Sequence, residues 1–333
     1  MVKEFVEKYL ANPHFLMNLT MEITSGCNLK CCHCYVEDRV HQEKSVFLPF
    51  DLIKRVVDEA YEMKAISISL TGGEPMTHPN FIEIIQYIKN KGFVLVLKTN
   101  GTLISEKNIR YIKECVDTLI LTRYGFSSAT YENVTGITGA FSKYENALKI
   151  LEQNAITYRE NIVLLKENEE ELDLFLAANS LVETYISINR FNPYAQLHRP
   201  TDEALKKYYA KKIGSLEIGK YEIAADDHIV CNCGVCSLTI NSQGDVNPCT
   251  CFYYSLGSLY DSTLNDIWEC EKRRKLTEKC KLKFFSQCME CPNRKYIHSI
   301  APCINYTETG NMNCVSDEMC RHCRIIKELQ NGG

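Results

Sequence analysis

Cysteine is the residue type with which this sequence could do the most chemistry. The chain has 333 residues and 18 cysteines: four lie within residues 27–34, one stands alone at Cys115, and the remainder fall between residues 231 and 323. The charged, amphipathic opening segment lacks the apolar core of an export signal, so we expect the thiols to stay reduced. Clustered thiols in a reducing compartment indicate metal binding or catalysis rather than disulfides.

The N-terminal group has the spacing C-x3-C-x2-C, formed by Cys27, Cys31 and Cys34. Cys32 is a fourth thiol directly beside Cys31, and we expect it to be a bystander because adjacent side chains diverge on most backbones. Three thiolates on one short loop are one too few for a closed tetrahedral zinc site. A [4Fe–4S] cubane normally takes four cysteines, so three would leave one iron open to a substrate or cofactor.

Repeated strand–helix units must position this loop. Short β-branched or Leu-rich segments with little polar alternation are typical of parallel strands buried on both faces. They alternate with segments of helical periodicity, which predicts an α/β fold with a parallel sheet, open or curled toward a barrel. The expected strands are 19–24, 66–70, 93–98, 118–122, 161–165 and 185–190, and the expected helices are 51–63, 80–90, 106–115, 141–154 and 169–182.

Two further loops follow strands in the way that the cysteine loop does. The segment "TGGEP" follows the second strand and "KTNG" follows the third. In parallel sheets chemistry gathers at the carboxyl ends of the strands, so we expect all three loops at one edge. Gly72 and Gly73 would let the backbone approach a ligand closely, Glu74 would offer an acceptor, and Pro75 would stiffen the exit. For "KTNG" an ordinary Asn-Gly turn is the alternative.

The thiol spacing after the first strand, together with the GGEP loop after the second, resembles the radical SAM enzymes. The resemblance implies a partial (β/α)6 TIM-like barrel. It also implies that Cys27, Cys31 and Cys34 bind a [4Fe–4S] cluster whose open iron binds S-adenosylmethionine (SAM). Such enzymes cleave SAM reductively to a 5′-deoxyadenosyl radical, which abstracts a hydrogen atom from the substrate. The cofactor-binding residues that the resemblance implies are Gly72, Gly73, Glu74, Pro75, Thr99, Asn100 and Arg123.

Within this set the resemblance implies individual roles. Glu74 would accept a hydrogen bond from the methionine ammonium group, and Thr99 and Asn100 would bind the ribose. Arg123 would contact the SAM carboxylate or the substrate, with an ordinary hydrogen bond as the alternative.

The C-terminal cysteines resemble a SPASM domain, the extension that carries auxiliary [4Fe–4S] clusters. Cys231 is followed after twelve residues by Gly244 and after four more by Cys249. The resemblance implies one or two auxiliary clusters, although the spacings after Cys291 are longer than the family pattern. One cluster would use Cys288, Cys291, Cys303 and one of Cys320 and Cys323. The other would use Cys231, Cys249 and Cys314, with Cys233, Cys236 or Cys251 as its fourth ligand.

Other roles stay open for parts of the cysteine set. Paired C-x2-C units also have zinc-ribbon spacing, so a zinc site is the alternative for the C-terminal block. Cys115, Cys270 and Cys280 are expected to be small buried hydrophobic residues. A spare thiol near the active site would instead donate a hydrogen atom to the substrate.

These observations predict four regions and one preferred function. The regions are an amphipathic segment (1–18), the partial barrel (19–200), a bridging segment (201–224) and a cysteine-rich, SPASM-like lobe (225–333). The expected function is modification of a peptide or protein, as in ribosomal-peptide (RiPP) maturation that forms a crosslink such as a thioether. The alternatives are sulfatase-type maturation, modification of a tetrapyrrole or other small molecule, and a non-catalytic zinc-binding module.

Composition and length set the expected partners. A net charge of −4 with both signs interspersed gives no indication of a nucleic-acid partner, and no apolar run is long enough to cross a membrane. We therefore expect a cytoplasmic enzyme that receives electrons from a donor such as ferredoxin or flavodoxin. Only about 18 residues precede the first strand, so the barrel mouth, the C-terminal lobe or a separate leader-peptide-binding protein would recognise a peptide substrate.

Overall fold

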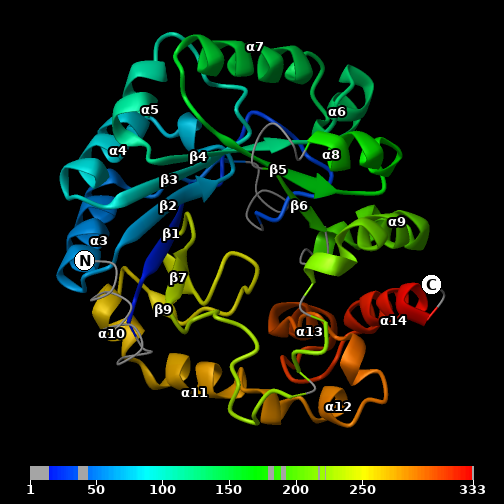
Figure 1. Cartoon of the computed structure of the whole chain (residues 1–333). Helices are drawn as coiled ribbons and strands as arrows, with labels where there is room; N and C mark the ends of the chain where they lie inside the picture. Colours follow the sequence, from blue (N-terminus) through cyan, green and yellow to red (C-terminus); the bar gives the residue numbers. More distant parts are fainter. Residues whose placement is uncertain are drawn as a thin grey trace.

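The structure is a computed structural model that describes residues 15–36, 44–178, 184–188, 193–216, 218–221 and 223–331 (Figure 1). Most of the predicted amphipathic segment, residues 1–14, lies outside the described residues, as do residues 179–182 at the end of the last predicted barrel helix.

Six parallel strands form the predicted sheet, and they pair in the order in which they occur along the chain. Figure 1 shows the sheet curving, with helices on its outer side, so the partial (β/α)6 barrel is confirmed. The strands are β1 (Asn18–Thr24), β2 (Ser67–Gly72), β3 (Val94–Thr99), β4 (Thr118–Arg123), β5 (Arg159–Leu164) and β6 (Thr184–Ile188).

The outer layer of helices is α3 (Phe50–Glu62), α4 (Phe81–Asn90), α5 (Ile109–Cys115), α6 (Ser128–Thr135), α7 (Ala140–Gln153) and α8 (Leu172–Ala178). The sequence did not predict α6, because its apolar residues show little helical periodicity. Capping interactions at its two ends fix where this helix begins and ends. The Ser127 hydroxyl accepts a hydrogen bond from the Thr130 backbone N–H, and Gly136 ends the helix at φ 65°.

The two faces of the sheet differ in polarity. Leu19, Met21 and Ile23 of β1 are buried in the core beneath the helices. Successive strand residues point to opposite faces, so Thr20 and Glu22 face the inside of the barrel. The strand is buried on both faces, as expected, but the expected lack of polar alternation is wrong, because the inner face carries polar residues and surrounds a polar site.

The sheet continues into the C-terminal part of the chain. The strand β7 (Ser237–Ile240) pairs in parallel with β1, and β8 (Asp245–Asn247) and β9 (Gly257–Ser258) follow as antiparallel strands. The helix α10 (Leu264–Trp268) packs beside α3, and Trp268 is buried in the same core as the barrel strands. The first part of the predicted SPASM-like lobe is thus continuous with the barrel.

The remaining helices lie in or beside the cysteine-rich region. They are α9 (Asp202–Lys212), α11 (Glu271–Lys279), α12 (Ser286–Met289), α13 (Pro302–Thr309) and α14 (Asp317–Asn331). The 3-10 helices are η1 (Pro75–Thr77), η2 (Glu169–Glu171), η3 (Pro193–His198), η4 (Ile213–Ser215), η5 (Leu282–Phe284) and η6 (Arg294–Tyr296). Arg199 connects the two regions, because its guanidinium pairs with Glu308 of α13 and Glu318 of α14.

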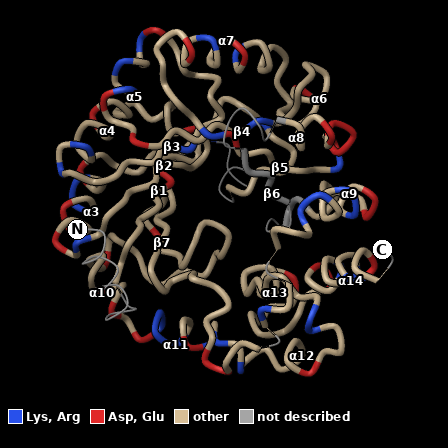
Figure 2. Tube along the Cα trace, in the orientation of Figure 1, with Lys and Arg blue, Asp and Glu red and all other residues tan. Residues whose placement is uncertain are grey.

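Acidic and basic residues are interspersed along the outer helices (Figure 2). In the part of the chain that the structure describes, no helix combines the length and the apolar character needed to cross a membrane.

Candidate active site and cluster sites

The loop that carries Cys27, Cys31 and Cys34 follows β1 and is fixed at both ends. The backbone N–H of Ser25 donates to the carbonyl of Val46 (2.9 Å). Farther along, the N–H of Lys30 donates to Thr135 (2.8 Å) and that of Cys32 to Val134 (3.0 Å). The unpredicted helix α6 therefore anchors the middle of the cysteine loop through carbonyls at its C-terminal end, and the three thiols of the motif are half-buried.

The glycines of the TGGEP loop are required by contact between two backbones. A Cβ atom on Gly73 would lie 2.1 Å from the carbonyl oxygen of Gly26, and one on Gly72 would lie 2.3 Å from that of Thr24. Hydrogen bonds hold this close approach: the Gly73 N–H donates to Thr24 and the Glu74 N–H donates to Gly26, both at 2.8 Å. The two glycines thus allow the backbone of the TGGEP loop to contact the start of the cysteine loop.

Glu74 is fully buried and holds the loops after β2 and β3 together. Its carboxylate accepts hydrogen bonds from the Thr99 hydroxyl (2.8 and 2.9 Å), the Asn100 N–H (2.8 Å) and the Met76 N–H (3.2 Å). Burial raises the pKa of Glu74 to about 7, against the lowering effect of these donors. The predicted role of Glu74 as an acceptor for the SAM ammonium stays a prediction, since the contacts described here are internal.

Asn100 orients the cysteine loop. Its side-chain Nδ2 donates to the Cys27 Sγ (3.7 Å) and to the Asn28 Oδ1 (3.0 Å), while its Oδ1 accepts from the backbone N–H of Thr102 (2.9 Å). Thr99 is likewise engaged with Glu74. Their predicted contacts with the SAM ribose stay predictions, and the structure adds a positioning role that the sequence did not indicate.

Arg123 lies on the outer side of the sheet. It shares its face of β4 with Leu119 and Leu121, which are buried in the core beneath the helices. Its guanidinium pairs with Glu160 (2.9 Å), whose carboxylate also accepts from the Tyr144 hydroxyl (2.7 Å). The structure therefore does not bring Arg123 to the inner face with the cysteine loop, and its predicted contact with SAM or substrate stays untested.

Two aromatic residues line the cysteine loop. The ring of His33 packs on that of Tyr124, with centroids 5.5 Å apart. Burial lowers the pKa of His33 to about 4, so the imidazole is neutral at neutral pH. Burial, followed by the charge of Cys31, raises the pKa of Tyr124 well above its usual value. Tyr124 is therefore a protonated phenol beside a candidate ligand.

Four late cysteines gather below the barrel: Cys231, Cys249, Cys251 and Cys303. Burial raises the pKa of Cys303 well above its usual value, and the neighbouring charges of Cys249, Cys251 and Cys231 raise it further. The sequence grouped Cys303 with Cys288 and Cys291, whereas α13 places it here. Of the three candidates for a fourth member, Cys251 acts on Cys303, and Cys233 lies beside Cys231 and Cys249.

Tyr35 lies between this group and the N-terminal thiols. Its hydroxyl bonds to the Thr71 hydroxyl (3.0 Å) on the inner face of the barrel. Burial raises the pKa of Tyr35, and the charge of Glu22 raises it further. The charges of Cys34 and Cys251 make smaller contributions in the same direction. A single side chain thus adjoins both thiol groups, a relationship that no spacing in the sequence could indicate.

A second group of four thiols lines a cavity of about 310 Å³ between α12 and α14. Burial raises the pKa of Cys288 to about 12, followed by the charges of Cys320, Cys291 and Cys323. Cys288 and Cys291 come from α12 and the residues after it, and Cys320 and Cys323 are adjacent along one face of α14. The structure therefore brings both members of the predicted pair, Cys320 and Cys323, to one cavity.

Cys233 lies beside the first group, because its thiol hydrogen-bonds to that of Cys231. The assignment of Cys314 to a cluster, which the sequence implied, stays a prediction. The Cys233 and Cys280 sulfurs are 3.8 Å apart in a buried position. Cys270 accepts a hydrogen bond from the Arg273 N–H at the start of α11 (3.4 Å), so it is a helix cap rather than a core residue.

The chemistry of the donors fits iron–sulfur clusters. Each group places thiols from separate turns around one region, and the buried groups disfavour bare thiolates, so a cationic centre is needed to hold them charged. Ligands of a single ion crowd together, whereas thiolates on a cubane bind different irons and lie farther apart. Among the described residues, neither the N-terminal three nor the late groups crowd as ligands of one ion would.

This curved parallel sheet, with a three-thiol loop at its carboxyl edge and two four-thiol groups below it, defines an α/β-barrel protein built around iron–sulfur centres. Residues 21–178 match the family model "Radical SAM superfamily", and residues 231–292 match SPASM, an iron–sulfur cluster-binding domain. The chain belongs to the radical SAM superfamily and carries a SPASM domain. This membership implies a [4Fe–4S] cluster that binds SAM and auxiliary clusters, as the sequence predicted.

Curated relatives and solved structures agree with this assignment. The chain is 25% identical over 297 residues to the antilisterial bacteriocin subtilosin biosynthesis protein AlbA of Bacillus subtilis, covering 84% of this chain and 66% of that protein. It is 32% identical over 158 residues to an AdoMet-dependent heme synthase of Methanosarcina barkeri, covering 46% and 44%. The chain thus spans less than two thirds of the length of these relatives.

A solved structure shows the same fold. Streptococcus suis SuiB bound to the precursor peptide SuiA superposes with a TM-score of 0.71 at 16% identity, covering 96% of this chain and 79% of SuiB.

Proposed function

We propose that this chain is a radical SAM/SPASM enzyme that modifies a peptide or protein, as a RiPP maturase that forms a crosslink such as a thioether. The observation that carries the radical chemistry is the loop with Cys27, Cys31 and Cys34 at the carboxyl edge of the barrel. The peptide class is supported by the similarity to the subtilosin biosynthesis protein, which extends over 84% of this chain and is not confined to the barrel.

In this proposal Cys27, Cys31 and Cys34 hold the cluster that binds SAM. The cluster and SAM, when bound, supply reductive cleavage and hydrogen-atom abstraction. The protein's own residues supply position: Asn100 donates to Cys27, and Gly72 and Gly73 pack the second loop against the first. A reactive intermediate requires rigid loops, because a small displacement of the reacting groups lowers the reaction rate by a large factor.

The inner face of the barrel offers the substrate polar contacts. Glu22 and Lys98 belong to this face. Burial lowers the pKa of Lys98, and the charges of Cys251 and Glu22 offset part of this effect. We assign this lumen to substrate binding. A peptide backbone, which carries donors and acceptors at every residue, suits such a surface.

The auxiliary sites follow the structural grouping in this proposal. Cys231, Cys249, Cys251 and Cys303 hold one cluster, and the other is held by Cys288, Cys291, Cys320 and Cys323. Cys314 is not a ligand. Two sets of four thiols make closed sites, in contrast to the open three-thiol site in the barrel.

Partners and location complete the proposal. The cysteines that this proposal assigns to clusters must stay reduced, which supports a reducing, cytoplasmic location and an electron donor such as ferredoxin or flavodoxin. Peptide recognition falls to the barrel mouth, the C-terminal region or a separate leader-peptide-binding protein.

The experiment uses the anaerobically reconstituted enzyme with SAM, dithionite and a peptide encoded beside its gene. The peptide is synthesised with deuterium on its backbone and side-chain carbons. Transfer of deuterium into 5′-deoxyadenosine, followed by mass spectrometry, supports the proposal. Formation of 5′-deoxyadenosine without deuterium transfer from any such peptide contradicts the peptide assignment.

Modification of a tetrapyrrole is the second candidate. It is favoured by the higher identity, 32%, to the heme synthase, but that similarity is confined to less than half of this chain. Replacing the peptide with a deuterated porphyrin precursor in the same assay separates the two substrates.

A further inference from the structure

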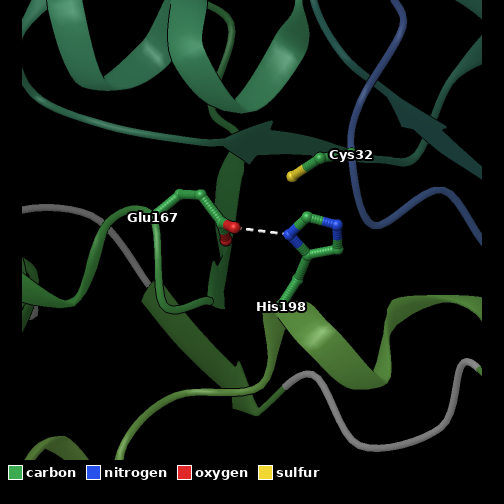
Figure 3. A group of neighbouring side chains, drawn as sticks. All are labelled: Cys32, Glu167 and His198. Carbon is green, nitrogen blue, oxygen red and sulfur yellow. Dashed lines mark hydrogen bonds and ion pairs between the residues drawn. The ribbon is translucent and has the colours of Figure 1, made fainter.

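Three side chains from distant segments meet beside the cysteine loop: Cys32, Glu167 and His198 (Figure 3). Cys32 belongs to the loop after β1, Glu167 to the loop after β5, and His198 is the last residue of η3. The three offer a sulfur, an oxygen and a nitrogen that all lie within 4.8 Å of one another. Within the described residues, no other group of three His, Cys, Asp or Glu side chains meets this distance.

Backbone contacts fix the positions of the three residues independently of their side chains. The Lys166 N–H donates to the His198 carbonyl (3.1 Å), which joins the two segments that carry Glu167 and His198. The Cys32 N–H donates to the Val134 carbonyl at the end of α6 (3.0 Å). Such support is what a preorganised ligand set requires.

The buried side chain of Asn168 adds to this rigidity. Its Oδ1 accepts from the Leu165 N–H (2.8 Å), and its Nδ2 donates to the carbonyls of Val163 (2.9 Å) and Tyr124 (3.1 Å). The loop that carries Glu167 is thus tied both to its own strand and to the end of β4.

The two oxygens of the Glu167 carboxylate differ in their contacts. The Glu167 Oε1 contacts the His198 Nδ1, as the dashed line in Figure 3 shows. The Glu167 Oε2 is buried and has no hydrogen-bond partner among the described residues. Leaving a carboxylate oxygen buried without a donor is costly, and a bound cation would remove that cost.

We propose that Cys32, Glu167 and His198 bind a single divalent transition-metal ion, with Zn²⁺ as the ion of choice. Thiolate, imidazole and carboxylate are the three ligand types that zinc takes in proteins. Three protein ligands leave a fourth tetrahedral position open. This site is separate from the iron–sulfur clusters, because Cys32 points toward Glu167 and His198 while Cys27, Cys31 and Cys34 form the cubane motif.

The test measures zinc in the fully reconstituted enzyme, so that the cluster cysteines are occupied by iron. The protein is equilibrated with Zn²⁺ against a competing chelator, and zinc and iron are counted per chain. We expect about one zinc per chain in addition to the iron. Zinc X-ray absorption should show one sulfur at about 2.3 Å and nitrogen or oxygen ligands at about 2.0–2.2 Å.

The variants Cys32→Ser, Glu167→Gln and His198→Gln each remove one ligand with little change in shape. Each should weaken zinc binding by more than about 100-fold, since loss of groups that merely hydrogen-bond a ligand already costs about 10–100-fold. The matched control is Cys115→Ser, which removes a buried thiol at the end of α5, and it should bind zinc as the wild type does.

Iron content reports whether the fold and clusters survive in each variant. No zinc in the wild type under these conditions would overturn the proposal. So would equal zinc affinity in the wild type and in a Cys32→Ser/Glu167→Gln/His198→Gln variant that retains its iron. Because the readout is metal content, this result does not depend on whether the enzyme modifies a peptide.

Discussion

The side-chain amide of Asn100 donates a hydrogen bond to the Cys27 sulfur across 3.7 Å. Asn100 stands at the end of β3 and Cys27 just after β1, so the contact crosses the intervening strand at the carboxyl edge of the sheet. Because hydrogen bonds to sulfur ligands stabilise the reduced form of a cluster, this contact connects the third loop to the redox property of the first.

Asn100→Ala should make the reduction potential of the SAM-binding cluster more negative while iron content is retained. The reason is that Cys27 loses a donor. Spectroscopic redox titration of the holoenzyme measures the shift. The control is Asn108→Ala, since the Asn108 amide lies in the same loop but donates to the Leu103 carbonyl. An unchanged potential in Asn100→Ala would show that the contact has no electronic effect.

Arg123→Met should destabilise the fold by about 3 kcal/mol, because it leaves the Glu160 carboxylate buried without its cationic partner. If Arg123 acts only on the outer face, the KM for SAM should stay within about twofold of the wild type. Thermal unfolding and the rate of 5′-deoxyadenosine formation check the two parts. The double variant Arg123→Met/Glu160→Leu should recover stability. A large rise in the KM for SAM in folded enzyme would instead support a role in binding SAM.

Cys303→Ser and Cys314→Ser should differ in iron content. Cys303 belongs to the buried group with Cys231, Cys249 and Cys251, whereas the proposal leaves Cys314 out of both groups. Cys303→Ser should lose or degrade one cluster, up to about four irons, and Cys314→Ser should keep all of its iron. Iron and acid-labile sulfide per chain decide between them. Loss of iron in Cys314→Ser alone would restore the grouping inferred from the sequence.

Glu74 should make stability depend on pH near neutrality. Burial raises its pKa from the ordinary 4.5 to about 7 in the folded protein. The folded state therefore binds this proton more tightly than the unfolded state, and its stabilising effect is present at low pH and lost as pH rises through about 7. Relative to Glu74→Gln, the wild type should lose about 2 kcal/mol between about pH 5.5 and 7.5. Anaerobic unfolding at both pH values measures the difference, and a stability difference that rises with pH would contradict it.

The sequence was sufficient for the architecture and for the open thiol site. Strand and helix periodicities predicted the six parallel strands, and the C-x3-C-x2-C spacing predicted three thiols on one loop. Both signals are local in the sequence, so they could be recognised without knowledge of the tertiary structure. The outward direction of Arg123 could also have been predicted, because alternate residues of a strand share a face and Arg123 alternates with Leu119 and Leu121.

Long-range packing accounts for what the sequence did not predict. The strand β7 is only four residues long, and its pairing with β1 depends on tertiary contacts rather than on its own pattern. Cys303 joins the group below the barrel because α13 is placed there, and the number of residues between cysteines does not encode that placement. The same is true of Cys32, Glu167 and His198, which come from three separate segments.

The central claim is that Cys27, Cys31 and Cys34 hold the cluster that cleaves SAM, while the C-terminal thiols hold two closed clusters. The most direct test compares the reconstituted wild type with a Cys27→Ala/Cys31→Ala/Cys34→Ala variant, counting iron and 5′-deoxyadenosine formed from SAM and dithionite. We predict about twelve irons and product formation in the wild type, and about eight irons with no product in the variant. Product formation by the variant, or a wild type that retains zinc in place of iron and forms no 5′-deoxyadenosine, would contradict it.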